Sequence, residues 1–166
     1  MTMLQSIDQL IEQIVADIPA AELESRLNGL DLNGVGALGR TPLMAATVQG
    51  SLAVVDMLVR NGASVDTTGN KRMTALHEAA ANGEVGIARY LLAHGAAVDA
   101  ATVDGATPLM CAAAWGSLDV AELLVARGAD WATTDCTGAT ASDIAREKGE
   151  GEMADWIDAR MPRDSR

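Results

Sequence analysis

TPLMAATVQG (residues 41–50), TALHEAAANG (74–83), TPLMCAAAWG (107–116) and TASDIAREKG (140–149) are four versions of one segment. Each begins with Thr and ends with Gly, and successive copies start 33 residues apart. Self-similarity at a fixed period of this size is the sequence signature of a protein built from stacked repeats. The period therefore decides the fold class before any single residue is interpreted.

Each repeat is predicted to contain two helices, and the first repeat illustrates why. Thr41 is a favourable N-cap, and Pro42 suits the first helical position. Gly50 can adopt the left-handed conformation that ends the helix. Ser51 can cap a second helix, which Gly62 ends. About a dozen residues then lead to the next Thr, which is enough chain for a projecting β-turn finger.

Two segments carry a resemblance to a known family. GRTPLMAATVQGSLAVVDMLVRNGASVD (39–66) and GATPLMCAAAWGSLDVAELLVARGAD (105–130) resemble the ankyrin repeat consensus, and the resemblance extends over roughly residues 29–161. It implies an all-α solenoid, in which helix–turn–helix units stack and β-turn fingers project from one side. It also implies a structural role for His77, whose ring would form hydrogen bonds within the helix–turn framework.

The ends of the chain depart from the repeat, as expected of capping units. We expect one domain over 1–162, divided into an N-terminal cap (1–38), three central repeats (39–71, 72–104 and 105–137) and a C-terminal cap (138–162), with 163–166 as a tail. In the N-terminal cap, one amphipathic helix would carry Leu4, Ile7, Ile11, Ile14 and Ile18 on its apolar face. Pro19 would end it, and 20–27 would form the second helix.

Composition limits the classes of partner. The net charge of −11 repels phosphate, so nucleic acid is a poor candidate and a protein with some basic surface is favoured. No apolar run is long enough for a membrane span. The two cysteines form no CxxC pair, which favours a reducing compartment. We therefore expect a cytoplasmic monomer that binds no membrane and no cofactor.

The helical wheel separates buried from outward positions in the first helix of each repeat. In 107–116, Leu109 and two alanines share one side, whereas Cys111 lies opposite and Trp115 lies at the flank. The 33-residue shift places Ala45 outward as well. In the resembled family these slots line a concave groove, which contacts partners together with the fingers. The candidate partner-binding residues are Leu38, Arg40, Val48, Gln49, Lys71, Met73, Glu78, Asn82, Val103, Asp104, Cys111, Trp115 and Lys148.

Trp115 is the centre of this predicted site, with Met73, Val103 and Glu78 around it. Exposed apolar side chains often mark a contact surface, and aromatic anchors contribute heavily to binding. The alternative is that Trp115 folds sideways over a neighbouring repeat and contributes only to stacking. The other two tryptophans, Trp131 and Trp156, are predicted to be structural.

The second finger breaks the pattern. Gly39, Gly105 and Gly138 each precede a repeat Thr by two residues, but Arg72 occupies this position in the second finger. Because a positive φ is costly for arginine, we expect an altered turn, hosted by 69–70 and presenting Lys71 and Arg72 at its tip. Such a tip could meet an acidic patch on a partner, or it could be a solvated turn.

No Walker loop, HExxH or GxSxG motif is present, and the cysteines and histidines lack metal-ligand spacing. The favoured function is a non-catalytic interaction module, acting as an inhibitor, an immunity protein or an adaptor. Two alternatives remain. One is a self-associating assembly protein that uses the N-terminal helix, and the other is an enzyme that depends on Cys111.

Overall fold

The computed structural model describes residues 6–160, and it is helical throughout that range apart from turns and loops. Leu4 and the tail lie outside the described residues. The helices come in pairs, each made of one first-layer and one second-layer helix. The pairs are α1 (Ile7–Val15) with α2 (Ala20–Glu24), α3 (Pro42–Val48) with α4 (Leu52–Arg60), α5 (Ala75–Asn82) with α6 (Val85–Ala93), α7 (Pro108–Ala114) with α8 (Leu118–Ala126), and α9 (Ala141–Lys148) with α10 (Gly151–Arg160).

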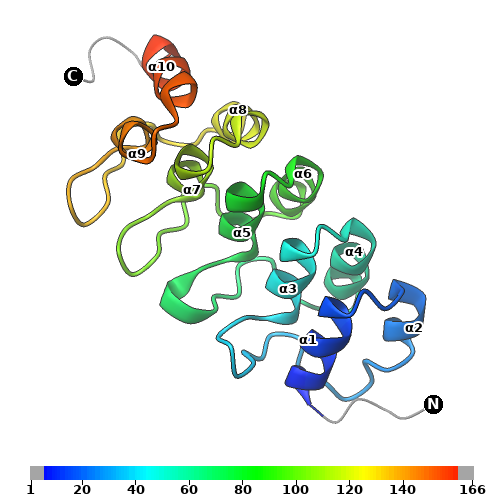
Figure 1. Ribbon diagram of the computed structural model, residues 1–166. Helices are drawn as coiled ribbons and strands as arrows, with labels where there is room; N and C mark the ends of the chain where they lie inside the picture. The colour runs from blue at the N-terminus through cyan, green and yellow to red at the C-terminus, as the bar shows by residue number, and fades with distance from the viewer. Residues whose placement is uncertain (1–5, 161–166) are drawn as a thin grey trace.

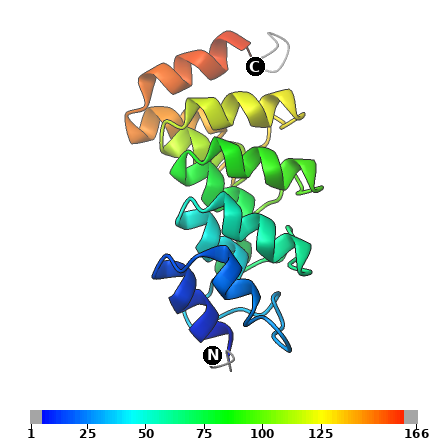
Figure 2. The same cartoon turned by 90° about the vertical axis from the view of Figure 1, so that its right-hand side faces the viewer.

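The pairs stack in chain order into a solenoid of two layers. Figure 1 shows α1, α3, α5, α7 and α9 in one row and the even-numbered helices in the other, with the fingers projecting from the odd-numbered row. The view turned by 90° shows the same order from the N-terminal to the C-terminal end (Figure 2). This arrangement confirms the all-α repeat fold expected from the 33-residue period.

Local capping chemistry explains where the first-layer helices begin and end. The hydroxyls of Thr41, Thr107 and Thr140 accept a hydrogen bond from the backbone N–H three residues on. Gly50 follows the end of α3 and has a φ of 70°. The equivalent glycines of the other repeats also have a positive φ. Ser51 occupies the predicted N-cap position, but its side chain makes no capping bond.

His77 links two repeats, and its predicted structural role is confirmed. The ring is fully buried; Nδ1 accepts from the Thr74 backbone N–H at 3.2 Å, and Nε2 lies 3.1 Å from the Ala106 carbonyl oxygen. In this arrangement Nε2 carries the proton and donates to Ala106. Burial lowers the pKa of His77, so the neutral ring is favoured.

The core contains few large side chains. Leu58, Leu91 and Leu124 recur every 33 residues and are completely buried. Between them, alanines such as Ala79 and Ala112 also have no exposed surface. Small side chains allow neighbouring helices to approach closely, so this composition is consistent with a stack of short helices.

The terminal pairs differ in part from the prediction. The second helix of the N-terminal cap ends at Glu24 rather than at residue 27, although Leu27 is still buried in the turn that follows. At the other end, the ring centroids of Trp131 and Trp156 lie 5.8 Å apart. Both indoles are half-buried against the core, so their predicted structural role is confirmed.

The second finger keeps the turn that we expected it to lose. Arg72 has φ 60°, close to φ 75° at Gly39, and its N–H donates to the Gly69 carbonyl as the equivalent glycines do in their fingers. The prediction that 69–70 hosts the turn is therefore wrong, because the backbone bonds shared by all fingers fix its position. The finger is nevertheless unusual, because Lys71 also has a positive φ, of 53°, within a short 3-10 turn (Asn70–Arg72).

Candidate protein-binding groove

A depression of about 410 Å³ crosses the first-layer helices at the centre of the stack. Its walls combine apolar side chains from three repeats with a few polar groups. We call it the central groove, and it is lined by Arg40, Val48, Met73, Glu78, Ala81, Asn82 and Trp115. All of these except Ala81 are residues of the predicted site, so the structure brings together positions that lie up to 75 residues apart in the chain.

Trp115 is 70% exposed in this groove. It follows the last residue of α7 and occupies the C-cap position, where the backbone turns toward the next helix. Such exposure contradicts the alternative that the indole folds over a neighbouring repeat to support stacking. A large apolar side chain left in water at the edge of a concave surface is a candidate binding anchor.

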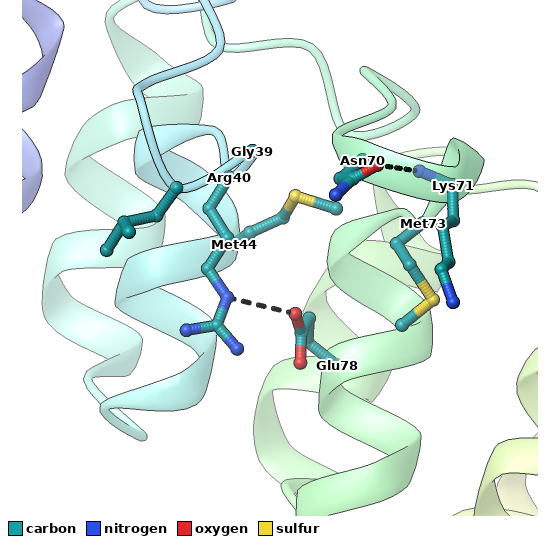
Figure 3. A pocket seen from close by; sticks show the side chains of 8 residues that line it. Gly39, Arg40, Met44, Asn70, Lys71, Met73 and Glu78 are labelled. Carbon is teal, nitrogen blue, oxygen red and sulfur yellow. Dashed lines mark hydrogen bonds and ion pairs between the residues drawn. The ribbon is translucent and has the colours of Figure 1, made fainter.

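A second, smaller hollow of about 210 Å³ adjoins the groove between the first two fingers. It shares Arg40, Met73 and Glu78 with the groove. We call it the finger notch, and it is lined by Leu38, Gly39, Arg40, Met44, Asn70, Lys71, Met73 and Glu78 (Figure 3). Sequence reasoning missed Met44, because its helical position faces inward and its side chain is 1% exposed. Its side chain nevertheless lines the notch.

One ion pair spans the boundary between notch and groove. Nε of Arg40, from the first finger, lies 3.3 Å from Oε1 of Glu78 on α5 (Figure 3). The Glu78 side chain is only 13% exposed, whereas that of Arg40 is 46% exposed. The pair therefore fixes a carboxylate in the wall and leaves much of the guanidinium open to solvent.

Cys111 is only partly exposed, so it faces solvent less than the helical wheel suggested. Burial, and secondarily the negative charge of Glu78, raises the pKa of this thiol to about 11. A thiol with this pKa is protonated at neutral pH and is a poor nucleophile. His77, the obvious base, already uses both ring nitrogens in structural contacts. Ala45, in the equivalent position to Cys111, is 3% exposed, so its predicted outward placement is wrong.

The remaining predicted residues lie outside the groove and notch. Gln49 is exposed, but its amide donates to the Val15 carbonyl at 2.8 Å and so ties α3 to α1. Val103 and Asp104 are exposed on the third finger, where their backbone groups bond to the neighbouring fingers. Lys148 is paired with Glu147 at 3.2 Å, near the C-terminal end. These positions therefore make contacts elsewhere on the molecule and do not line the central groove or the finger notch.

Within residues 6–160, no helix combines the length and apolar character that a membrane crossing requires. Across the same residues, no three His, Cys, Asp or Glu side chains gather in a way that could hold a metal ion.

Comparison with known families gives two matches. A family model described as an ankyrin repeat matches residues 38–70, and one described as three copies of ankyrin repeats matches residues 62–135. Together they extend over residues 38–135, more than half of the 166-residue chain, and include every residue of the groove and the notch. A search of curated proteins finds no match.

Proposed function

The chain belongs to the ankyrin repeat family, whose members generally mediate protein–protein interaction and are generally non-catalytic, and from this premise we propose that its central groove and fingers bind one partner protein. The observation that carries the proposal is the 70% exposure of Trp115 within the groove. Val48 and Met73 extend the apolar surface beside it. An anchor side chain of the partner would pack on this surface and exclude water from the indole.

The groove is held in shape before a partner arrives. It lies over α3, α5 and α7, and α5 packs directly against both of the other two helices. The Arg40–Glu78 ion pair and the His77–Ala106 hydrogen bond join neighbouring repeats below it. Preorganisation lowers the conformational entropy lost on association. A rigid groove of this kind suits a protein that blocks the surface of an enzyme, as an inhibitor or immunity protein does, and it suits an adaptor equally well.

Charge favours a partner whose overall surface is basic. The chain carries a net charge of −11, and long-range attraction would raise the rate of association with such a partner. Association should therefore slow as salt is added. This argument also disfavours nucleic acid, whose phosphates the acidic surface repels.

Affinity capture from an extract of the native cell tests the proposal. The wild-type protein and the Trp115→Ala variant would serve as baits, and Leu118→Ala, which removes an apolar side chain 37% exposed on α8, is the matched control. We expect the control to retain the partner captured by the wild type and Trp115→Ala to lose it. Equal capture by all three baits would refute the site.

A second candidate function is self-association through the N-terminal helix. A hollow of about 450 Å³ lies beside α1, lined by Asp8, Ile11, Glu12, Ala37 and Leu38. Leu38 is 83% exposed at its edge, so this surface could receive a second copy. Light scattering decides the matter, because a monomeric mass at high protein concentration would exclude this candidate.

A further inference from the structure

The second finger presents two cations that the molecule itself does not use. The side chains of Lys71 and Arg72 are exposed, and neither has an ion-pair or hydrogen-bond partner among residues 6–160. Elsewhere on the same face, Arg40 is paired with Glu78 and Lys148 with Glu147. On a chain with a net charge of −11, two adjacent unpaired cations make this fingertip locally positive, which suits a partner group of opposite sign.

The backbone that presents these cations is strained. Lys71 and Arg72 both have positive φ, at 53° and 60°, although neither is glycine. In the third finger, by contrast, only Gly105 has a positive φ, of 80°. Residues other than glycine rarely adopt this conformation, and where they do, the strain is often associated with a ligand-binding or switch region.

Packing between fingers does not require the unusual conformation at Lys71. Its carbonyl accepts from the Val103 N–H at 2.9 Å, which links the second finger to the third. The third finger makes the equivalent bond to the fourth through Asp104, whose carbonyl accepts from the Cys136 N–H at 2.8 Å without a positive φ. The same contact is therefore available to an unstrained backbone.

Of the two fingertip cations, Lys71 lines the finger notch, where it faces a second cation, Arg40. In Figure 3, the Lys71 ammonium and the Arg40 guanidinium extend in the same direction on either side of Met73 and Glu78. The ion pair to Glu78 uses only Nε of Arg40, so the terminal nitrogens of the guanidinium have no partner among the described residues. A carboxylate brought to the mouth of the notch would find the Arg40 guanidinium on one side and the Lys71 ammonium on the other.

We propose that the finger notch binds an Asp or Glu side chain of the partner segment whose apolar anchor packs on Trp115. This inference rests on the proposed function and adds the register of the bound segment. The partner can be basic overall and still require one acidic residue at this point, since pairwise charge complementarity fixes orientation at short range. A carboxylate suits an arginine fork and an adjacent ammonium group.

Selection from a random dodecapeptide library displayed on phage tests the inference. The baits are the wild type, the finger variant Lys71→Asn/Arg72→Gly, and the control Arg89→Gln/Arg127→Gln. The control removes the same charge from exposed arginines, on α6 and after α8, that also lack partners among residues 6–160. Asn and Gly suit a positive φ, so the finger variant should remain folded.

We expect peptides selected on the wild type and on the control to share an Asp or Glu at a fixed distance from an apolar residue. The finger variant should lose that acidic preference and bind a synthetic copy of the most enriched peptide about tenfold more weakly. The absence of any enriched peptide, or of an acidic position on the wild type, would overturn the inference. So would an acidic preference unchanged by the finger variant.

A further bait separates this inference from the proposed function. If the enriched peptide loses affinity for Trp115→Ala but not for the finger variant, the notch assignment fails and the groove assignment stands. If it loses affinity for both, the notch and groove bind one segment, as proposed. If it loses affinity for neither, both assignments are wrong for this segment.

Discussion

Replacing Arg72 with glycine should stabilise the protein, although it removes no clash and adds no contact. The φ of 60° at Arg72 lies in a region that costs a non-glycine residue roughly 1–2 kcal/mol. Glycine relieves this cost, but it adds freedom to the unfolded chain, worth about 0.4–1 kcal/mol in the opposite direction. The expected net gain is about 0.8 kcal/mol, or ~2–3 °C in Tm for a chain of this size.

Urea unfolding followed by circular dichroism would measure this gain, with two variants as controls. Arg72→Ala removes the charge but keeps the β-carbon, so its stability should stay within about 0.5 kcal/mol of the wild type. Gly138→Ala makes the reverse change in the fourth finger, where φ is 85° and an added β-carbon would meet no atom within 4 Å. It should lose stability by a similar amount. If Arg72→Gly is no more stable than Arg72→Ala, the reasoning about strain is refuted.

Three further predictions concern His77, Cys111 and Gly69. Burial lowers the pKa of His77, so in acid the unfolded chain binds a proton that the folded chain excludes. The free energy of unfolding should therefore fall as the pH drops below about 6.5. His77→Met should remove this part of the acid sensitivity, as measured by urea unfolding. An acid dependence unchanged in the variant would contradict the assignment. The pKa of Cys111 is raised to about 11, so in a Cys136→Ser protein this thiol should react with Ellman's reagent at pH 8 about a hundredfold more slowly than an ordinary thiol. A rate equal to that of an ordinary thiol would contradict the raised pKa. Gly69→Ala should lower the free energy of unfolding in urea by about 2 kcal/mol, because the added β-carbon would overlap the Gly39 carbonyl oxygen. An unchanged free energy would show that the two fingers can move apart without cost.

The repeat fold could be predicted from the sequence because its signals are local and recur. Thr41 caps a helix through its own hydroxyl, and Gly50 ends that helix through its own positive φ. The structure at each position therefore depends on nearby residues and not on distant parts of the chain. Arg72 shows the limit of such reasoning. Intrinsic preference argued against a positive φ there, but hydrogen bonds common to all the fingers imposed it.

For the candidate binding surface, the sequence predicted which residues face solvent only in part. The helical wheel correctly placed Trp115 toward solvent, whereas it also placed Ala45 outward, and that residue is buried. A helical wheel represents one helix alone and leaves out the neighbouring repeats that cover it. The same omission explains Gln49, whose side chain donates to the Val15 carbonyl, and Met44, whose side chain lines the notch between the first two fingers.

The dissociation constant of the captured partner for Trp115→Ala, compared with Leu118→Ala, tests the central claim most directly. Titration calorimetry at fixed salt concentration would measure it for both variants and the wild type. If the groove around Trp115 is the binding surface, removing an aromatic anchor worth about 2 kcal/mol or more should raise the constant at least ~30-fold, while Leu118→Ala leaves it within about twofold. A constant unchanged by Trp115→Ala would contradict the account.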